Sequence, residues 1–356
     1  MSQFVFARRP DLERSWPFVH QRLVERLGAQ GQVQVVPLQR DQALGEHADL
    51  QEVDAVALFG GRLTVECVAR APRLKAIGCN TDNTGRGLPL AALAARGIPI
   101  VDTTRAWGQS VAEIALSLAL SALRRVPQWH ADLAGGARSF EYEAVQYCDA
   151  TGFANGELGT KRIGIIGLGQ IGGRVARWCA ALGTDAATGP DLAGQVLGYD
   201  PYLPDGVAER WGVHRVDVDS LVDESEVVFV TVPPTPTAKH LLDRSRIQRL
   251  RRGALVVIVT RAHAVDMDAL RERIVADELC AALDVYDVEP LPLDDPLRGR
   301  PNVVHTPHIA GRTRDANLRT ADLLTDDFAR ILRGEPPHNE LTPAAIQART
   351  GEAAPR

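Results

Sequence analysis

Short runs of apolar residues, rich in Val, Ile and Leu, alternate with helix-like segments along most of the chain. In the first half the runs are VQVVPL (33–38), DAVALF (54–59), LKAIG (74–78) and IPIVDT (98–103). From Arg162 a second series gives RIGIIG, QVLGYD, VHRV, VVFVTV, ALVVIVT, CAALDVY and NVVHTP. Continuous apolar runs separated by helices are typical of parallel sheets that are covered on both faces. The pattern therefore predicts two α/β domains.

The segments between and after these runs predict how the domains are joined. Residues 110–126 are apolar on all sides, so we expect a long helix buried between larger bodies. Residues 134–160 are irregular and Gly-rich, which favours a connection between domains. A further helix is expected at about 313–333, and the composition of residues 335–356 indicates a mobile tail.

Composition narrows the possible functions. The chain has 356 residues and a formal net charge of −5, so it has no electrostatic footprint for nucleic acid or an anionic membrane. Its arginines greatly outnumber its three lysines but are spread along the whole chain. The five cysteines include no CxxC spacing, which predicts neither a disulfide framework nor a metal site and fits a reducing cytoplasm. No apolar run is long enough to span a membrane.

A glycine motif opens the second series of strands. GLGQIG places Gly167, Gly169 and Gly172 after the strand RIGII and before a helix. In this context the first glycine permits a tight turn, the second admits a pyrophosphate close to the backbone, and the third allows close packing of helix on strand. Unpaired N–H groups at the start of the helix then meet the phosphates. The motif predicts a dinucleotide site.

An acidic residue ends the following strand. Asp200 closes QVLGYD, where a carboxylate would accept hydrogen bonds from the adenine ribose and repel a 2′-phosphate, so we expect NAD instead of NADP. It lies 28 residues after Gly172, farther than the usual ~20. We attribute the difference to an inserted loop at 184–195. The alternative is that Asp200 is only a turn residue before Pro201.

Three later strands end in side chains suited to 2-keto acid chemistry. Arg261 follows ALVVIVT, Glu289 lies in ALDVYDVEP, and His308 lies in NVVHTPHIAG. Each has an ordinary structural alternative, namely a surface arginine, a turn glutamate and a structural histidine. His305 is the rival histidine, but it lies inside the apolar strand, whereas His308 follows Pro307, where the strand should end.

Taken in order, these segments resemble the D-isomer-specific 2-hydroxyacid dehydrogenases. The resemblance runs from about Ala55 to Leu332. It rests on GLGQIG, GYDP, VPPTPTAKHLL, TRAHAVDMDAL, ALDVYDVEPLP and TPHIAG, which occur in the family's order and at compatible distances. The resemblance implies NAD-dependent reduction of a small 2-keto acid to its D-2-hydroxy acid.

The family gives each member of the trio a role that suits its chemistry. Arg261 would bind the substrate carboxylate and polarise the keto oxygen, because a guanidinium offers a fork of N–H donors. His308 would be the general acid in reduction and the base in oxidation, since imidazole titrates near neutral pH. Glu289 would hydrogen-bond the far ring nitrogen and fix the orientation of the imidazole.

The resemblance also assigns contacts to the cofactor. These are Gly167, Gly169, Gln170, Ile171, Gly172, Asp200, Val232, Pro233, Thr260, Asp284 and His308. The tandem prolines of VPPTP keep their loop stiff. Asp284 would accept from the nicotinamide carboxamide, and the alternative is that it caps a strand end.

Substrate binding is expected in the first domain, where the chain departs from the family pattern. Gly60 and Gly61 follow DAVALF and would let backbone amides approach a carboxylate. Arg62, Arg86 and Arg105 lie in or beside loops expected to face the cleft, which suggests a dianionic 2-keto acid. Two departures affect this site: Ala262 and His263 replace the glycines usual after the arginine, and CNTDNTGRG (79–87) replaces a loop resembling GTGVDN.

The expected architecture is two doubly wound parallel-sheet domains. A Rossmann NAD-binding domain at 127–312 is inserted in a flavodoxin-like substrate domain formed by 1–126 and 313–356, with the active-site cleft between them. The resemblance alone suggests a homodimer, and the cysteine usage favours a cytoplasmic location. Two alternatives stay open: an NAD-binding sensor of the corepressor type, and a formate- or phosphite-type dehydrogenase.

Overall fold

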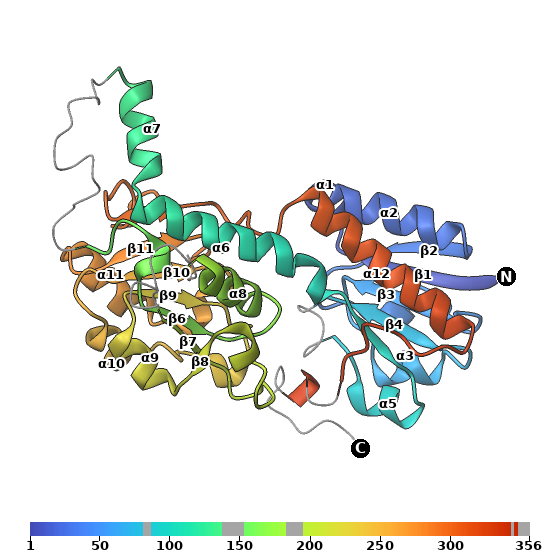
Figure 1. Cartoon of the computed structure of the whole chain (residues 1–356). Coiled ribbons are helices and arrows are strands. Elements are labelled where there is room, and N and C mark those ends of the chain that lie inside the picture. The colour runs from blue at the N-terminus through green and yellow to red at the C-terminus, as the bar shows by residue number, and fades with distance from the viewer. Residues whose placement is uncertain (81–86, 137–152, 183–194, 343–344, 348–356) are drawn as a thin grey trace. The chain divides into compact units, whose positions relative to one another are not determined.

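The computed structural model describes residues 1–80, 87–136, 153–182, 195–342 and 345–347. The chain divides into two compact units (Figure 1). Unit 1 comprises Met1–Trp107 and Arg312–Arg356, and unit 2 comprises Gly108–Gly311. Unit 1 is therefore discontinuous, and unit 2 is inserted within it.

Unit 1 contains a five-stranded parallel sheet in the order β2-β1-β3-β4-β5, the order of flavodoxin-like folds. Its strands are β1 (Ser2–Arg8), β2 (Gly31–Pro37), β3 (Ala55–Phe59), β4 (Ala76–Cys79) and β5 (Ile100–Asp102). The sequence pattern missed β1, which lies between β2 and β3 and pairs Phe4 with both Val33 and Ala55.

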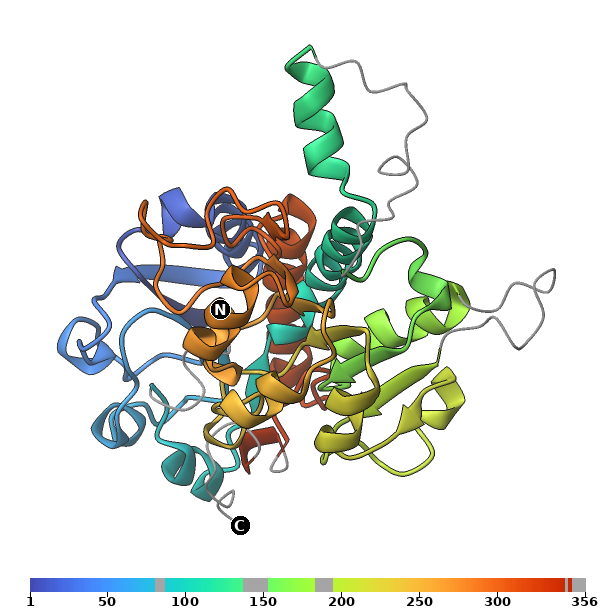
Figure 2. The same ribbon diagram turned by 90° about the vertical axis from the view of Figure 1, so that its left-hand side faces the viewer.

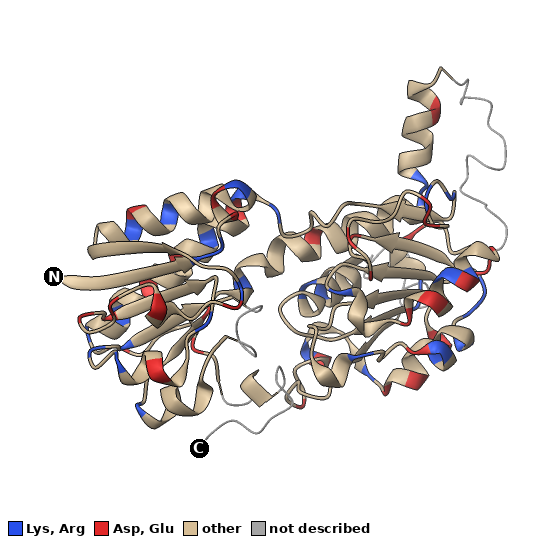
Figure 3. Ribbon diagram, turned by 180° about the vertical axis from the view of Figure 1, so that it is seen from behind, with Lys and Arg blue, Asp and Glu red and all other residues tan. Residues whose placement is uncertain are grey.

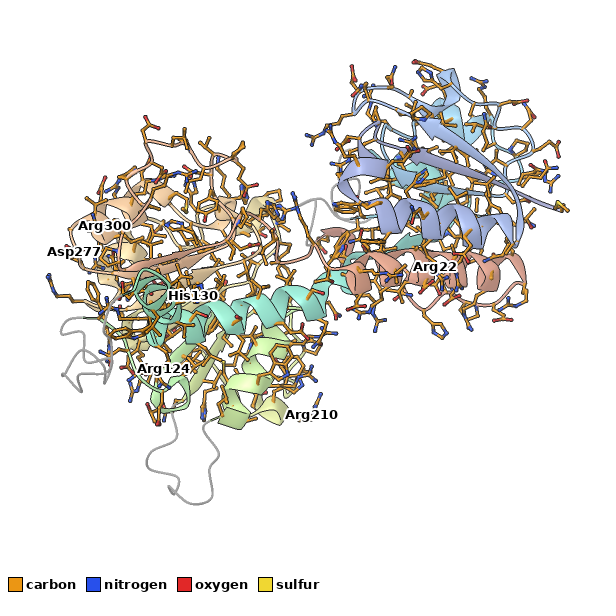
Figure 4. All side chains as sticks on the ribbon, turned by 90° about the horizontal axis from the view of Figure 1, so that it is seen from above. Arg22, Arg124, His130, Arg210, Asp277 and Arg300 are labelled. Carbon is orange, nitrogen blue, oxygen red and sulfur yellow. The ribbon has the colours of Figure 1, made fainter. Side chains whose placement is uncertain are left out.

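Helices cover both faces of this sheet (Figure 2). One face carries α2 (Pro17–Gly28) and α12 (Arg314–Leu332), and the other carries α3 (Val65–Ala69) and α5 (Leu90–Ala95). Buried Leu23 and Phe328 pack with the strands on the first face. Figure 4 labels Arg22 where α2 meets α12, and its Nε donates to Asp322 Oδ1 at 2.9 Å.

Unit 2 contains a seven-stranded parallel sheet in the order β12-β11-β10-β9-β6-β7-β8, so all seven predicted strands are present. They are β6 (Ile163–Ile166), β7 (Val196–Tyr199), β8 (His214–Arg215), β9 (Val227–Val230), β10 (Leu255–Ile258), β11 (Cys280–Leu283) and β12 (Val303–His305). One core cluster joins β9–β11 to helices α9 (Val218–Glu224), α10 (Arg244–Arg249) and α11 (Met267–Val275).

The apolar helix between the two series belongs to unit 2. Helix α6 (Gly108–Leu123) contacts β10, β11 and β12, and it also contacts α8 (Gly172–Leu182). The unit boundary therefore falls at Trp107 instead of the predicted residue 126, because the helix buries its small residues against this sheet. Only one face is buried, and Leu120 on the other is 37% exposed, so the expectation of burial on all sides was wrong.

Although Arg105 and Glu113 interrupt it, the helical segment Thr104–Leu123 is long and apolar enough on average to cross a membrane. Half of its most apolar window is buried inside the protein, as in the core helix of a globular domain. A second helix, α7 (Val126–Ala134), follows α6 with Pro127 in its first turn, and none of its residues is buried. Figures 1 and 2 show α7 standing away from the sheet of unit 2.

The predicted mobile tail is ordered over residues 335–342. Buried Asp327 on α12 accepts hydrogen bonds from His338 N and Asn339 N, both at 2.8 Å. Leu341 N donates to Ile100 O at 2.7 Å, and the Leu341 side chain is buried. The composition of this segment misled because one buried carboxylate holds it against the edge of the unit 1 sheet.

Candidate functional site

The glycine loop lies at the switch point of the unit 2 sheet. Strand β6 leads to β7 on one side and has β9 on the other, and ligands of doubly wound sheets bind beyond the carboxyl ends of such strands. Gly167 has φ +93°, where a side chain would be strained. A Cβ at Gly172 would lie 1.8 Å from Gly167 O, whereas a Cβ at Gly169 would meet nothing within 4 Å. Gly167 therefore makes the turn, Gly172 permits the close packing, and Gly169 leaves room for a ligand, as the motif predicts.

The start of α8 presents backbone donors toward this opening. In the described part of the chain, no residue accepts a hydrogen bond from the N–H of Gly169, Gln170 or Ile171. Such donors, together with the positive end of the helix dipole, suit a pyrophosphate. The loop thus fits the dinucleotide that its sequence predicts.

Asp200 lies beside the loop at the end of β7. Its Oδ2 accepts from Leu168 N and its Oδ1 from Tyr202 N, both at 2.9 Å. The side chain is only partly buried, so the carboxylate retains acceptor capacity for ribose hydroxyls. Arg215 donates to the Asp200 carbonyl at 3.2 Å, but it also pairs with the carboxylate of Asp205 at 2.9 Å. The inserted loop at 184–195 lies almost entirely outside the described residues.

The segments after β9 and β10 are tied together. Thr260 Oγ1 donates to Val232 O at 2.9 Å, and the ring of His263 contacts Thr235 O through Nε2 at 2.9 Å. Val232 also packs on the glycine loop, because a Cβ at Gly167 would lie 2.7 Å from its Cγ1. His263, which replaces a family glycine, therefore braces the loop that contains Val232 and Pro233.

The three candidate catalytic residues follow neighbouring strands at one edge of the sheet. Arg261 comes after β10, Glu289 after β11 and His308 after β12, and β11 pairs with both of its neighbours. Strands in a sheet are spaced by about 4.8 Å, so the ends of β10 and β12 are about 10 Å apart. Arg261 Nη1 donates to the carbonyl of the preceding residue, Thr260, at 2.7 Å, which restricts the orientation of the guanidinium.

Glu289 and His308 form a direct pair. His308 Nδ1 lies 2.6 Å from Glu289 Oε2, and Glu289 Oε1 accepts from Tyr286 N at 3.0 Å. Because a carboxylate only accepts, Nδ1 must carry a proton, which leaves Nε2 as the nitrogen that exchanges one. Both side chains are about one-third exposed, so the pair is open to a reactant.

His305, the alternative histidine, has a hydrogen-bond partner at each ring nitrogen. His305 Nε2 lies 3.0 Å from Leu297 O and its Nδ1 lies 3.1 Å from the Tyr286 hydroxyl. Burial lowers the pKa of His305 and raises the pKa of Tyr286 to about 12. A neutral His305 with both nitrogens engaged has no atom left for proton exchange, which favours His308.

Asp284 is fully buried directly after β11. Its Oδ1 accepts from Thr306 Oγ1 at 2.6 Å and Ile309 N at 2.9 Å, and its Oδ2 accepts from Ala310 N at 2.9 Å. These contacts match the alternative interpretation, a strand-end cap. The contact with a nicotinamide carboxamide stays a prediction.

The substrate residues predicted in unit 1 lie at the carboxyl edge of its sheet. Gly60 and Gly61 are buried after β3, and no described residue accepts a hydrogen bond from either N–H. Arg62 Nε donates to Asp41 O at 3.1 Å, and Arg105 Nη1 donates to Asn339 Oδ1 at 3.0 Å. Arg86 lies outside the described residues.

Sequence reasoning missed two residues at these edges. Arg9 follows the unrecognised strand β1, and a Cβ at Gly60 would lie 2.3 Å from Arg9 N, so the two loops touch. Its guanidinium lies 5.8 Å from the ring centroid of Trp16. Thr306, the second, donates to Asp284. The arginine pair in FARRP was the available signal for Arg9, whereas nothing local marked Thr306.

Comparison with known proteins finds a matching family model and several similar proteins. Residues 116–310 match the family model described as D-isomer specific 2-hydroxyacid dehydrogenase, NAD binding domain. Glyoxylate/hydroxypyruvate reductase B of Pectobacterium carotovorum is 30% identical over 309 residues, covering 85% of this chain and 89% of the relative. A D-3-phosphoglycerate dehydrogenase of Haemophilus influenzae is 33% identical over 309 residues, covering 84% of this chain and 69% of the relative.

Other relatives are longer than this chain. A D-3-phosphoglycerate dehydrogenase of Methanocaldococcus jannaschii is 31% identical over 95% of this chain, which spans 60% of that protein and 50% of a similar one from Archaeoglobus fulgidus. Among solved structures, a phosphoglycerate oxidoreductase of Rhizobium etli has a TM-score of 0.75 at 24% identity. The alignment covers 96% of this chain and 98% of that one.

Proposed function

The chain belongs to the D-isomer specific 2-hydroxyacid dehydrogenase family, and we propose that it reversibly reduces a small 2-keto acid to the D-2-hydroxy acid with NADH. The observation that carries this proposal is the pair formed by His308 Nδ1 and Glu289 Oε2 at 2.6 Å, on the sheet edge that also carries Arg261. NADH, when bound, supplies the hydride. The protein then has to bind the substrate, orient it and supply a proton.

The proton step follows from the direction of the pair. With Nδ1–H directed at Glu289, the protonated ring of His308 offers Nε2–H to the keto oxygen as negative charge develops there. Glu289 stabilises the imidazolium and holds the ring in orientation. In the reverse direction the neutral ring accepts the hydroxyl proton at Nε2. The same nitrogen therefore serves both directions.

Substrate orientation is proposed for Arg261. The Arg261 guanidinium, whose Nη1 donates to Thr260 O, would bind the substrate carboxylate and polarise the keto oxygen. The cofactor would be held by the donors of Gly169, Gln170 and Ile171, with Asp200 on the ribose. Gly167 and Gly172 shape the cofactor loop, Val232 packs on it, and Thr260 holds Val232 through its carbonyl. Pro233, the next residue, is proposed to contact the cofactor from the same segment.

We further propose that the substrate is dianionic. The open amides of Gly60 and Gly61 suit a carboxylate, and the loop beside them carries Arg62. Arg9 adds a cation whose backbone touches Gly60, and at 3.7 Å its pairing with Asp11 is loose. Arg86 and Arg105 are the other candidate cations. Phosphorylated, phosphono and dicarboxylic 2-keto acids meet this description.

A homodimer is proposed from unit 2. Helix α7 has no buried residue, and beside its first residues lies an open groove of about 720 Å³ lined by Leu116, Leu120, Val126 and Trp178. Figure 4 shows Arg124 and His130 on this side of the unit. An exposed apolar groove next to a projecting helix suits a second copy of the chain. Light scattering on the purified protein measures the assembly; the cytoplasmic location stays a prediction.

The test of the function is NADH absorbance loss with a panel of 2-keto acids. We expect turnover with at least one of glyoxylate, hydroxypyruvate, pyruvate, 2-oxoglutarate and phosphonopyruvate. Tight NADH binding without any turnover would contradict the enzyme proposal and favour an NAD sensor. Oxidation of formate or phosphite would indicate the other alternative. Arg9→Ala, Arg86→Ala and Arg105→Ala, each tested with mono- and dianionic keto acids, examine the dianion proposal, and equal losses on both classes would contradict it.

A further inference from the structure

The loop that carries His308 is bound to one buried carboxylate. Asp284 receives Thr306 Oγ1 and Ile309 N at Oδ1 and Ala310 N at Oδ2, and its backbone carbonyl receives His308 N at 2.8 Å. Asp284 N in turn donates to Ile258 O on β10 at 2.9 Å. One residue therefore connects the His308 loop to the centre of the sheet.

This loop needs such support because His308 has an unfavourable backbone conformation. Its φ is +52°, in the left-handed region that residues other than glycine rarely adopt. Such a conformation persists where surrounding contacts determine it. The imidazole is held by Glu289, but a ring contact does not fix the backbone, and the backbone N–H groups of residues 308–310 all donate to Asp284.

We infer that Asp284, assisted by Thr306, is a positioning residue that holds His308 in its strained conformation so that Nδ1 reaches Glu289 and Nε2 points outward. The inference rests on the proposed function for the role of His308. Only a carboxylate suits the position: donors arrive at both oxygens, and an amide would place its NH2 against one of them. Asp284 therefore acts through His308, whatever else it contacts.

Thr306 offers the cleanest test, because its hydroxyl reaches Asp284 at 2.6 Å while its backbone is held separately by Leu283 O. Thr306→Val keeps the shape of the side chain and removes that hydrogen bond. We expect kcat to fall about tenfold. The KM for the keto acid and the Kd for NADH should stay within about twofold. Thr306→Ser is the matched control and should behave like the wild type.

A second readout does not depend on turnover. The ring nitrogens of His308, observed by ¹⁵N NMR in the protein without cofactor, report which nitrogen carries the proton. We expect Thr306→Val to weaken the signature of a protonated Nδ1 hydrogen-bonded to Glu289, and Thr306→Ser to preserve it. If the wild type reduced no keto acid, the proposed function would fail, yet this measurement would still test the positioning.

Asp284→Asn gives the stronger perturbation, and we expect a fall in kcat of about a hundredfold or more with the same change in the His308 ring signals. If this variant does not fold, Thr306→Val carries the test alone. Two results would overturn the inference. One is a Thr306→Val protein with wild-type kcat and ring signals, and the other is a defect confined to NADH affinity, which would mean that Asp284 serves only the cofactor.

Discussion

Replacing Glu289 by glutamine tests the proposed role of the Glu289–His308 pair with little change in side-chain shape. Tyr286 N donates to Oε1 at 3.0 Å, so the amide oxygen must occupy that position. The amide NH2 then faces His308 Nδ1, where the carboxylate accepted a hydrogen bond. Glu289→Gln therefore removes both the acceptor and the negative charge that favour the imidazolium.

The magnitude follows from the exposure of the pair. A hydrogen bond to a charged group contributes about 1.5–3 kcal/mol. His308 and Glu289 are 35% and 36% exposed, so solvent screening favours the lower end of this range, about 1.5 kcal/mol. Since 1.36 kcal/mol corresponds to a factor of ten in rate, kcat/KM for keto-acid reduction should fall about tenfold.

The assay is NADH oxidation with the best keto acid. Because the variant stabilises the imidazolium less, we expect slower reduction, while the Kd for NADH is preserved. Glu335→Gln is the matched control, because Glu335 pairs with Arg333 at 2.8 Å within unit 1, whereas Glu289 and His308 belong to unit 2. A Glu289→Gln enzyme with wild-type kcat/KM would refute the role of the pair.

Three further predictions concern the cofactor loop and the core. Gly172→Ala should lower the Tm markedly, since its methyl group would meet Gly167 O at 1.8 Å. Gly169→Ala should keep the Tm and lose NADH affinity. If the two variants behaved alike in melting and in NADH binding, the assignment of the glycine loop to the dinucleotide would be contradicted. Wild-type protein should bind NADH more tightly than NADPH in fluorescence titrations, and Asp200→Ala should reduce this difference in affinity. Equal affinities in the wild type would contradict the contact between Asp200 and the ribose. Burial lowers the pKa of His305, so as the pH falls below about 6.5 only the unfolded chain binds this proton, and the free energy of unfolding falls by at most about 1.4 kcal/mol per pH unit. Urea unfolding of the wild type and His305→Gln would show it, and identical pH slopes would argue against the neutral core histidine.

Much of the site is local in the sequence and could be predicted from it. The glycine loop and the strand ends that carry Arg261, Glu289 and His308 follow from short motifs and from the rule that parallel strands end at one edge. The even spread of arginines along the sequence persists in the fold, since Figure 3 shows Lys and Arg interspersed with Asp and Glu along the elements of both units. These features depend on neighbours along the chain.

The features that the sequence did not reveal depend on distant contacts. Strand β1 has only a short apolar run before two arginines, and its identity comes from pairing with β2 and β3. The order of residues 335–342 comes from Asp327, and the conformation of His308 comes from Asp284. A buried carboxylate that gathers backbone N–H groups leaves no periodic signal, so its role emerges only from the fold.

Net charge was a poor guide to the ligand, because the proposed contacts with anions are made by backbone N–H groups and single arginines. Net charge describes the whole surface. Recognition of a carboxylate or pyrophosphate depends on a few donors at strand and helix ends.

Deuteride transfer from NADH that carries deuterium at both C4 positions tests the central claim most directly. With the keto acid that turns over fastest, mass spectrometry and chiral chromatography of the product should show one deuterium at C2 of the D-2-hydroxy acid, and His308→Ala should abolish its formation while binding NADH normally. A product without deuterium, an L-configured product, or undiminished turnover by His308→Ala would contradict the account.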